Sequence, residues 1–156
     1  MKIELASSYG FCFGVKRAIE IAQKYENSAT MGPLIHNEDE INRLKKDFNV
    51  GLYSQLSDVK PDDTVIIRTH GIPKNDLKEL KKGVKKVINA TCPFVTTPQN
   101  IVKNMSKEGY SILIFGDIEH PEVKGVKSYA SDLDDVHIIL SPKDLKNIKF
   151  KNNKIA

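Results

Sequence analysis

Short apolar runs alternate with amphipathic stretches along this chain of 156 residues, and that alternation restricts the fold more than any other feature. Val15, Ala18, Ile19 and Ala22 have the i, i+3, i+4, i+7 spacing of one helix face, which predicts a helix over residues 14–25. Strands separated by helices predict βαβ units, a mainly parallel sheet and the α/β fold class. The apolar runs that are typical of buried strands cover residues 64–67, 87–88, 111–115 and 136–140.

Further elements follow from spacing and from capping residues. Thr97 followed by Pro98 is typical of an N-cap with proline at the first helical position, which predicts a helix from there to Gly109. Residues 3–5 and 50–53 are weaker strand candidates. Helical spacing also predicts helices around residues 41–48, around residues 77–80 and directly after Pro121.

A faint internal repeat suggests two similar units. The segment VIIRTHGIPKNDL passes from a predicted strand through His70 into a predicted helix, and ILIFGDIEHPEVKGV does the same through His120. The stretch between Pro93 and Pro98 would join the two units. The length of 156 residues fits one ordinary domain or two small ones.

The composition excludes several classes of protein. The net charge is only +4, carboxylates lie among the lysine clusters and there is no Trp, so solvated helix faces are expected instead of a nucleic-acid interface. Two cysteines are too few for a disulfide-rich secreted scaffold. Neither a signal peptide nor an apolar run of 18 residues is found, so a cytoplasmic protein with no membrane segment is expected.

Polar residues with chemical potential gather in loops that follow predicted strands or precede predicted helices. Ligands of open α/β sheets bind outside the carboxyl ends of the strands, and helix N-termini there favour anions, so one shared site is predicted. The members of this set are Cys12, His36, His70, Cys92, His120 and Glu122.

Each member also has an ordinary structural interpretation. Cysteines 80 positions apart define no metal site by spacing, and a buried, inert thiol is the default for either one. A loop histidine is usually a surface residue, and Glu122 could simply be a first-turn carboxylate that the helix dipole favours. His137, within a predicted strand, is interpreted as structural.

Five motifs taken together resemble the LytB family, the 4-hydroxy-3-methylbut-2-enyl diphosphate reductases of the non-mevalonate isoprenoid pathway. They occur in the order and spacing of the family and run through most of the chain. One departure is Thr97-Pro98-Gln99, where many members carry a Lys-Val-His-like stretch. The motifs are GFCFGVKRAI (10–19), LIHN (34–37), RTHG (68–71), ATCPFV (90–95) and HPEVKG (120–125).

The resemblance implies three αβα units around a pseudo-threefold axis, with one [4Fe–4S] cluster at the centre. Residues 1–92 would form the first unit, with residues 1–11 packing against the third, and residues 93–156 would form a truncated second unit. The family's cluster is held by three cysteines, of which Cys12 and Cys92 match the first two. The third lies beyond residue 156, so the chain is expected to be an N-terminal fragment.

The resemblance also implies roles and partners. His36, His70 and His120 match the residues that hold the substrate diphosphate, and Glu122 matches the proton donor. The reaction removes an allylic hydroxyl as water, and a ferredoxin- or flavodoxin-type protein supplies the electrons. Two alternatives stay open: a zinc or phosphate-binding module without redox activity, and an inert fragment.

Overall fold

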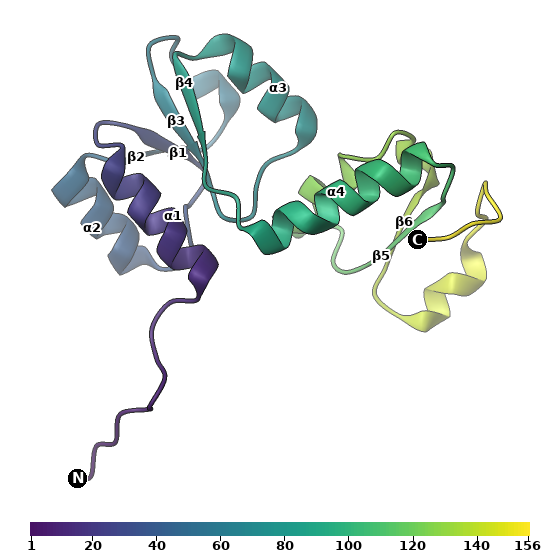
Figure 1. The fold of residues 1–156 in the computed structure, drawn as a ribbon, viewed down its shortest axis with the longest axis horizontal. Helices are drawn as coiled ribbons and strands as arrows, with labels where there is room; N and C mark the ends of the chain where they lie inside the picture. Colours follow the sequence, from purple (N-terminus) through teal and green to yellow (C-terminus); the bar gives the residue numbers. More distant parts are fainter.

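The computed structural model describes residues 1–156, which form two lobes with a long helix between them (Figure 1). The large lobe is built on a four-stranded parallel sheet in the order β2-β1-β3-β4. Residues 1–11 extend away from it and are exposed. The large lobe comprises α1 (Phe13–Lys24), β1 (Ala29–Met31), α2 (Glu38–Phe48), β2 (Gly51–Tyr53), a 3-10 turn (Leu56–Asp58), β3 (Thr64–Ile67), α3 (Lys74–Gly83) and β4 (Lys86–Asn89).

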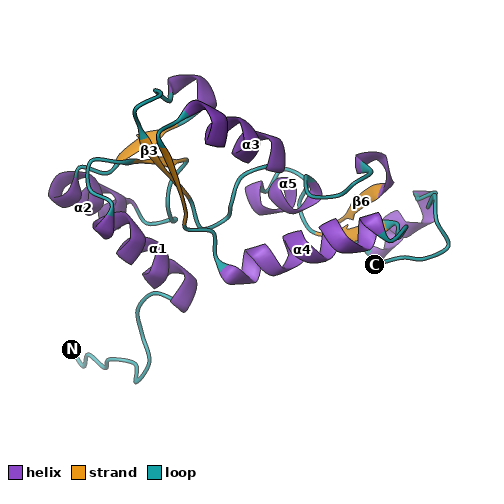
Figure 2. Cartoon of the chain, turned by 45° about the horizontal axis from the view of Figure 1, so that its top comes forward, coloured by secondary structure: helices purple, strands orange, loops and turns teal.

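Helices cover both faces of this sheet, as Figure 2 shows. Ile66 of β3 packs in the core formed with α1 and α2, whereas its neighbours Val65 and Ile67 pack in the core formed with α3. Successive side chains of a strand point to opposite faces, so a strand buried on both faces has a continuous apolar sequence. The apolar run at residues 64–67 therefore belongs to a central parallel strand.

The small lobe has a two-stranded parallel sheet and its own core. That core contains Val102, Ile112 and Val126, one from each of three successive elements. The last residues of the chain pair with the free edge of β5, where the Leu113 N–H donates to the Ala156 carbonyl over 2.9 Å. The elements are α4 (Pro93–Lys107), β5 (Ile112–Phe115), α5 (Pro121–Lys127), β6 (Val136–Ile139) and 3-10 turns at Leu133–Asp135 and Pro142–Asn147.

The α/β class and the parallel pairing are confirmed, but the predicted start of α4 is wrong. The helix begins at Pro93, with Cys92 as N-cap, so Pro98 lies inside it. Pro98 has no N–H to donate to the carbonyl four residues earlier, which costs stability without ending the helix. Pro93 occupies the first helical position. The Thr97–Pro98 pair has the sequence of a helix start, but it lies within a helix that began four residues earlier.

One strand was missed and one predicted strand does not form, for different reasons. Strand β1 was not predicted because three residues, Ala29 to Met31, give too short an apolar signal. Residues 3–5 form no strand, since no other part of the chain pairs with them. The candidate at residues 50–53 is confirmed as β2. The division between residues 92 and 93 stays a prediction.

A buried carboxylate, Asp135, organises the polar part of the small lobe. It is 3% exposed and accepts hydrogen bonds from Ser111 Oγ and Asn152 Nδ2, each over 2.7 Å, and from the Lys151 N–H over 3.2 Å. His137 Nε2 lies 3.2 Å from the same carboxylate, consistent with a structural histidine. Burial raises the pKa of Asp135, but these hydrogen bonds together lower it to about 2.

Asp135→Asn is expected to destabilise the chain by about 2–4 kcal/mol, because its amide nitrogen would face the N–H group of Asn152 Nδ2 or of Lys151, which cannot accept a hydrogen bond. The effect should depend on pH. The pKa rises from about 2 when folded to 3.8 when unfolded, so the carboxylate contributes fully above pH 4 to 5 and its contribution disappears as the pH falls towards 2. Urea unfolding between pH 2 and 7 measures the difference, with the exposed Asp134→Asn as control. An equal loss in the control would contradict this assignment.

Candidate functional site

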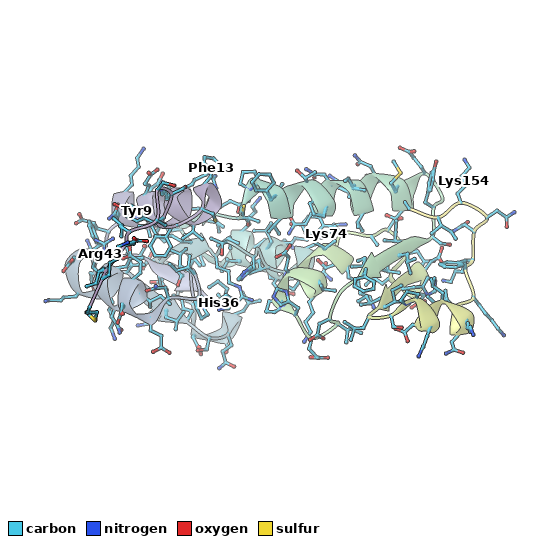
Figure 3. The ribbon with its side chains drawn as sticks, turned by 90° about the horizontal axis from the view of Figure 1, so that it is seen from below. Tyr9, Phe13, His36, Arg43, Lys74 and Lys154 are labelled. Carbon is cyan, nitrogen blue, oxygen red and sulfur yellow. The ribbon has the colours of Figure 1, made fainter.

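Three histidines from separate loops come together beside the carboxyl ends of the large sheet. His36 follows β1, His70 follows β3 and His120 caps α5 of the small lobe. The ring centroids of His36 and His70 are 4.9 Å apart, and those of His70 and His120 are 5.8 Å apart. In Figure 3, His36 lies in the large lobe and Lys74 lies where the lobes meet. We call His36, His70 and His120 the histidine cluster.

The sheet topology explains why the cluster forms between β1 and β3. Strand β1 leads through α2 to β2 on one side, and β3 leads through α3 to β4 on the other, with the two helices on opposite faces. Ligand crevices in open α/β sheets lie at such a switch point. The Thr69 Oγ1 donates to the Leu34 carbonyl over 3.0 Å, which ties the two loops together. A groove of about 210 Å³ there is lined by His36 and His70.

The cluster is rich in donors and has no negative partner. No ion pair within the chain involves His36, His70 or His120. Burial lowers the pKa of His70, and the neighbouring charges of His36, Arg68 and His120 lower it further. The Nδ1 atom of His70 is buried without a hydrogen-bond partner. This arrangement favours binding of an anion, which would stabilise a protonated His70.

A hydrogen bond determines which ring nitrogen of His120 carries the proton. Its Nδ1 accepts the Glu122 N–H over 3.2 Å, as the N-cap of α5. A nitrogen that accepts carries no proton, so the neutral ring has its proton on Nε2, where it can donate to a ligand. Glu122 is half-buried at the second position of the helix, and its carboxylate makes no hydrogen bond or ion pair within the chain.

The two cysteines lie at the starts of two helices. Cys12 is the N-cap of α1 and is exposed, whereas Cys92 is the N-cap of α4 and is half-buried. A Cβ atom at Gly14 would overlap Cys92 Sγ, so this thiol lies against the first turn of α1. Gly14 follows Cys12 by two residues. Arg17 Nη1 donates to the Thr91 carbonyl over 3.2 Å and fastens α1 to this turn. Helix N-termini favour thiolates.

The two thiols suit an iron–sulfur cluster in kind, and both lie at the first turn of a helix. They are fewer than the three cysteines that the resemblance implies, and no three His, Cys, Asp or Glu side chains of this chain converge as a metal site. A structural zinc site needs four such ligands. The zinc alternative therefore gains no support.

Gln99, to which the sequence assigned no function, is a buried polar residue at the site. It is 4% exposed, and its Nε2 atom has no hydrogen-bond partner. That atom lies 2.9 Å from the place of a Cβ on Gly71, whose φ of +71° already favours glycine. A three-residue departure from the family motif marks the position, but its burial is visible only in the structure.

Comparison with known proteins agrees with the motifs and with the geometry. A family model described as LytB protein matches residues 3–156. The chain belongs to the LytB family. None of its helices combines the length and the apolarity that crossing a bilayer requires.

Relatives of the chain are named 4-hydroxy-3-methylbut-2-enyl diphosphate reductase. One from Sulfurovum is 64% identical over 148 residues, which are 95% of this chain and 53% of that protein. One from Campylobacter concisus is 61% identical over all 156 residues, which match 56% of that protein. The LytB chain thus spans about half the length of the curated relatives it matches.

Solved structures of family members have the same fold. A structure of (E)-4-hydroxy-3-methyl-but-2-enyl diphosphate reductase, the terminal enzyme of the non-mevalonate pathway, is 40% identical with a TM-score of 0.78 over 88% of this chain and 50% of that one. The E-1-hydroxy-2-methyl-but-2-enyl-4-diphosphate reductase of Plasmodium falciparum is 30% identical with a TM-score of 0.83 over 96% and 48%. The parallel α/β architecture is therefore that of the LytB reductases.

Proposed function

We propose that this chain is the part of a 4-hydroxy-3-methylbut-2-enyl diphosphate reductase that binds the diphosphate and supplies two cluster ligands. The reaction takes up two electrons and two protons, removes the allylic hydroxyl as water and gives isopentenyl and dimethylallyl diphosphate. The observation that carries the proposal is the histidine cluster, with rings 4.9 and 5.8 Å apart and no carboxylate paired to them. The names of the relatives support the same reaction.

The histidines divide the work of binding the diphosphate. His120 donates through Nε2–H, because its Nδ1 is engaged by the Glu122 N–H. The pKa of the half-buried His70 is lowered by burial, so its ring is neutral at pH 7 until an anion favours the imidazolium. The exposed His36 lies beside it and lines the same groove.

Cys12 and Cys92 would hold the [4Fe–4S] cluster together with one further cysteine. When bound, the cluster supplies electrons that side chains cannot supply and a Lewis-acidic iron. The position of Cys92 is defined by the contact of its Sγ with Gly14, and that of Cys12 by the start of α1. The redox partner of ferredoxin or flavodoxin type and the cytoplasmic location stay predictions.

Glu122 is the proposed proton donor. Pro121 fixes the main chain just before it, and the Glu122 N–H donates to His120 Nδ1, so residue 122 is held next to a member of the proposed diphosphate site. The carboxyl group of Glu122 forms no ion pair within the chain, so it is free to contact a ligand. Carboxyl groups near an anion and away from bulk water retain a proton more easily.

His120→Asn separates ligand binding from helix capping. The Asn Oδ1 can still accept the Glu122 N–H, so α5 keeps its cap, but the Nε2–H donor is lost. In a reductase of full family length, substrate binding is expected to weaken about ten- to a hundredfold, the loss of one charge-assisted hydrogen bond. Cluster absorbance and melting temperature should stay close to those of the unmodified enzyme.

The control for this variant is Glu119→Gln, which removes a nearby exposed charge and should leave affinity unchanged. Unchanged affinity in His120→Asn, or loss of its cluster, would contradict the assignment. Titration of the 156-residue chain with inorganic diphosphate tests the inert-fragment alternative, which predicts no binding. An anion bound at the cluster should raise the pKa of His70, which NMR of its ring protons measures.

A further inference from the structure

One of the three arginines of the chain has no partner. Arg43 forms a two-fold hydrogen bond with Glu40 over 2.9 and 2.6 Å, and Arg17 donates to the Thr91 carbonyl over 3.2 Å. Arg68 makes no side-chain hydrogen bond or ion pair, and its Nε atom is buried. A guanidinium that has lost part of its hydration without gaining a partner is destabilised, and a bound anion would offset that loss.

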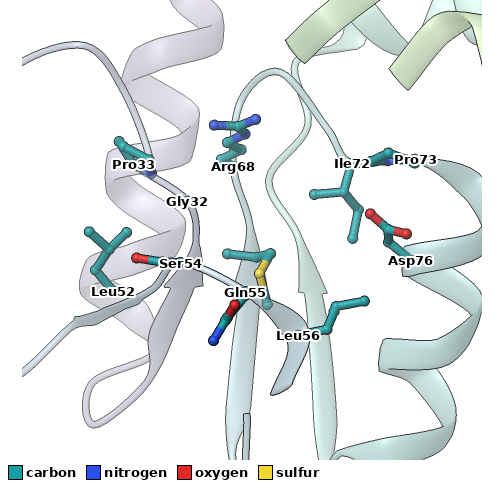
Figure 4. Close-up of a pocket in the computed structure, with 11 residues that line it drawn as sticks. Gly32, Pro33, Leu52, Ser54, Gln55, Leu56, Arg68, Ile72, Pro73 and Asp76 are labelled. Atoms are coloured by element: carbon teal, nitrogen blue, oxygen red, sulfur yellow. The ribbon is translucent and has the colours of Figure 1, made fainter. Parts of the chain in front are cut away.

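Arg68 lines a pocket of about 440 Å³ at the carboxyl ends of three neighbouring strands (Figure 4). Gly32 follows β1, Ser54 comes just after β2, and Arg68 follows β3. None of the residues that line this pocket lines the groove of about 210 Å³ at His36 and His70. It is therefore a separate cavity at the same edge of the sheet, where parallel sheets commonly bind ligands.

The guanidinium of Arg68 packs against the turn after β1. A Cβ atom at residue 32 would lie 2.8 Å from Arg68 Nη1, so the guanidinium packs directly against the main chain of this turn and a larger residue would displace it. Gly32 also has a φ of +73°, which favours glycine for a second reason. Arg68 thus lies against a turn whose shape requires glycine, with its guanidinium at the pocket.

The remaining walls combine apolar and polar side chains, with one carboxylate among them. Figure 4 shows Leu52 and Ser54 on one side, and Ile72 and Asp76 on the other. Asp76 forms no ion pair with Arg68, and burial raises its pKa, as does the nearby Glu79. Its charge opposes anion binding, so the pocket suits one singly or doubly charged group better than an extended polyanion.

We propose that this pocket binds a small oxyanion, a carboxylate or a phosphate monoester carried on a short apolar chain, with Arg68 as its charged contact. The oxyanion accepts hydrogen bonds from the guanidinium beside Gly32, and the apolar chain lies against Leu52 and Ile72. The negative charge of Asp76 limits the affinity of the pocket for the anion. The pocket shares no lining residue with the groove at the histidine cluster, and the proposal does not depend on the proposed reductase activity.

Titration of the 156-residue chain with hexanoate, hexyl phosphate and hexanol tests the proposal, with calorimetry for affinity and amide NMR for location. We expect saturable binding of at least one anion, with shifts at Gly32 and Ser54, and no comparable binding of hexanol. The tighter of the two anions identifies the oxyanion class. Arg68→Gln should weaken that binding about ten- to a hundredfold, and the control Arg43→Gln should leave it unchanged.

Asp76→Asn provides a test that does not depend on how well Arg68→Gln folds. It removes the opposing charge and should strengthen anion binding several-fold. The proposal is overturned if hexanol binds as tightly as both anions, if neither anion saturates, if the shifted amides lie at His36 and His70 instead, or if Asp76→Asn leaves the affinity unchanged or weakens it.

Discussion

Glu122→Gln is expected to lower turnover about 10²- to 10⁴-fold in a reductase of full family length, with little change in substrate affinity or cluster content. Glutamine keeps the shape of the side chain and its hydrogen-bonding capacity but has no acidic proton. The cap of α5 uses the main-chain N–H of residue 122, so the substitution leaves that hydrogen bond intact. Steady-state kinetics and cluster absorbance on one anaerobic preparation measure the effect.

The structural interpretation of Glu122 predicts a different result. A first-turn carboxylate that only interacts with the helix dipole contributes about 0.3–1 kcal/mol, so its loss would lower the melting temperature slightly and leave turnover unchanged. Glu119→Gln is the matched control, because it removes an exposed charge just before the same helix. Near-normal turnover in Glu122→Gln would assign the proton to another group.

The 156-residue chain alone is expected to retain essentially no [4Fe–4S] cluster after anaerobic reconstitution and gel filtration. It has two thiols, Cys12 and Cys92, whereas the resemblance to the LytB family implies three. No third His, Cys, Asp or Glu side chain converges with them as a metal site. The exposed thiol of Cys12 would leave any assembled cluster open to solvent and to loss of iron. Iron and acid-labile sulfide analysis per chain is the measurement.

A reductase of full family length, reconstituted in parallel, is the control and should bind about four irons per chain. Cys92→Ser in that enzyme should abolish the cluster, because the thiol next to Gly14 is one of the proposed ligands. About four irons held stably by the 156-residue chain as a monomer would show that two cysteines suffice and would refute the proposed ligand set.

Much of the fold could be predicted because the relevant signals are local. The face formed by Val15, Ala18, Ile19 and Ala22 is enough to predict α1, which the structure has at Phe13–Lys24. Strand β1 could not be predicted, since its burial comes from neighbours on both sides and its sequence is only Ala29, Thr30 and Met31. The start of α4 was misplaced because two prolines compete for one helical start, and local rules do not rank them.

The site was predictable as a set of residues but not as a geometry. Loops that follow parallel strands must meet at one edge, so the approach of His36 to His70 follows from the topology. The orientation of His120 could not be predicted, because it depends on a hydrogen bond to its own helix. The contact between Gly14 and Cys92 and the isolation of Arg68 depend on residues far apart in the sequence, which no pattern along the chain records.

The histidine cluster draws its members from two separately packed cores. His36 and His70 belong to the large lobe and His120 to the small lobe, and a direct hydrogen bond between the lobes runs from the Lys74 N–H to Ser128 Oγ over 2.9 Å. An anion held by all three rings would act as a reversible cross-link, stabilising the joined form by about 2.7 kcal/mol at a hundred times its Kd. Ligand concentration would then decide whether the lobes unfold one after the other or in a single cooperative transition.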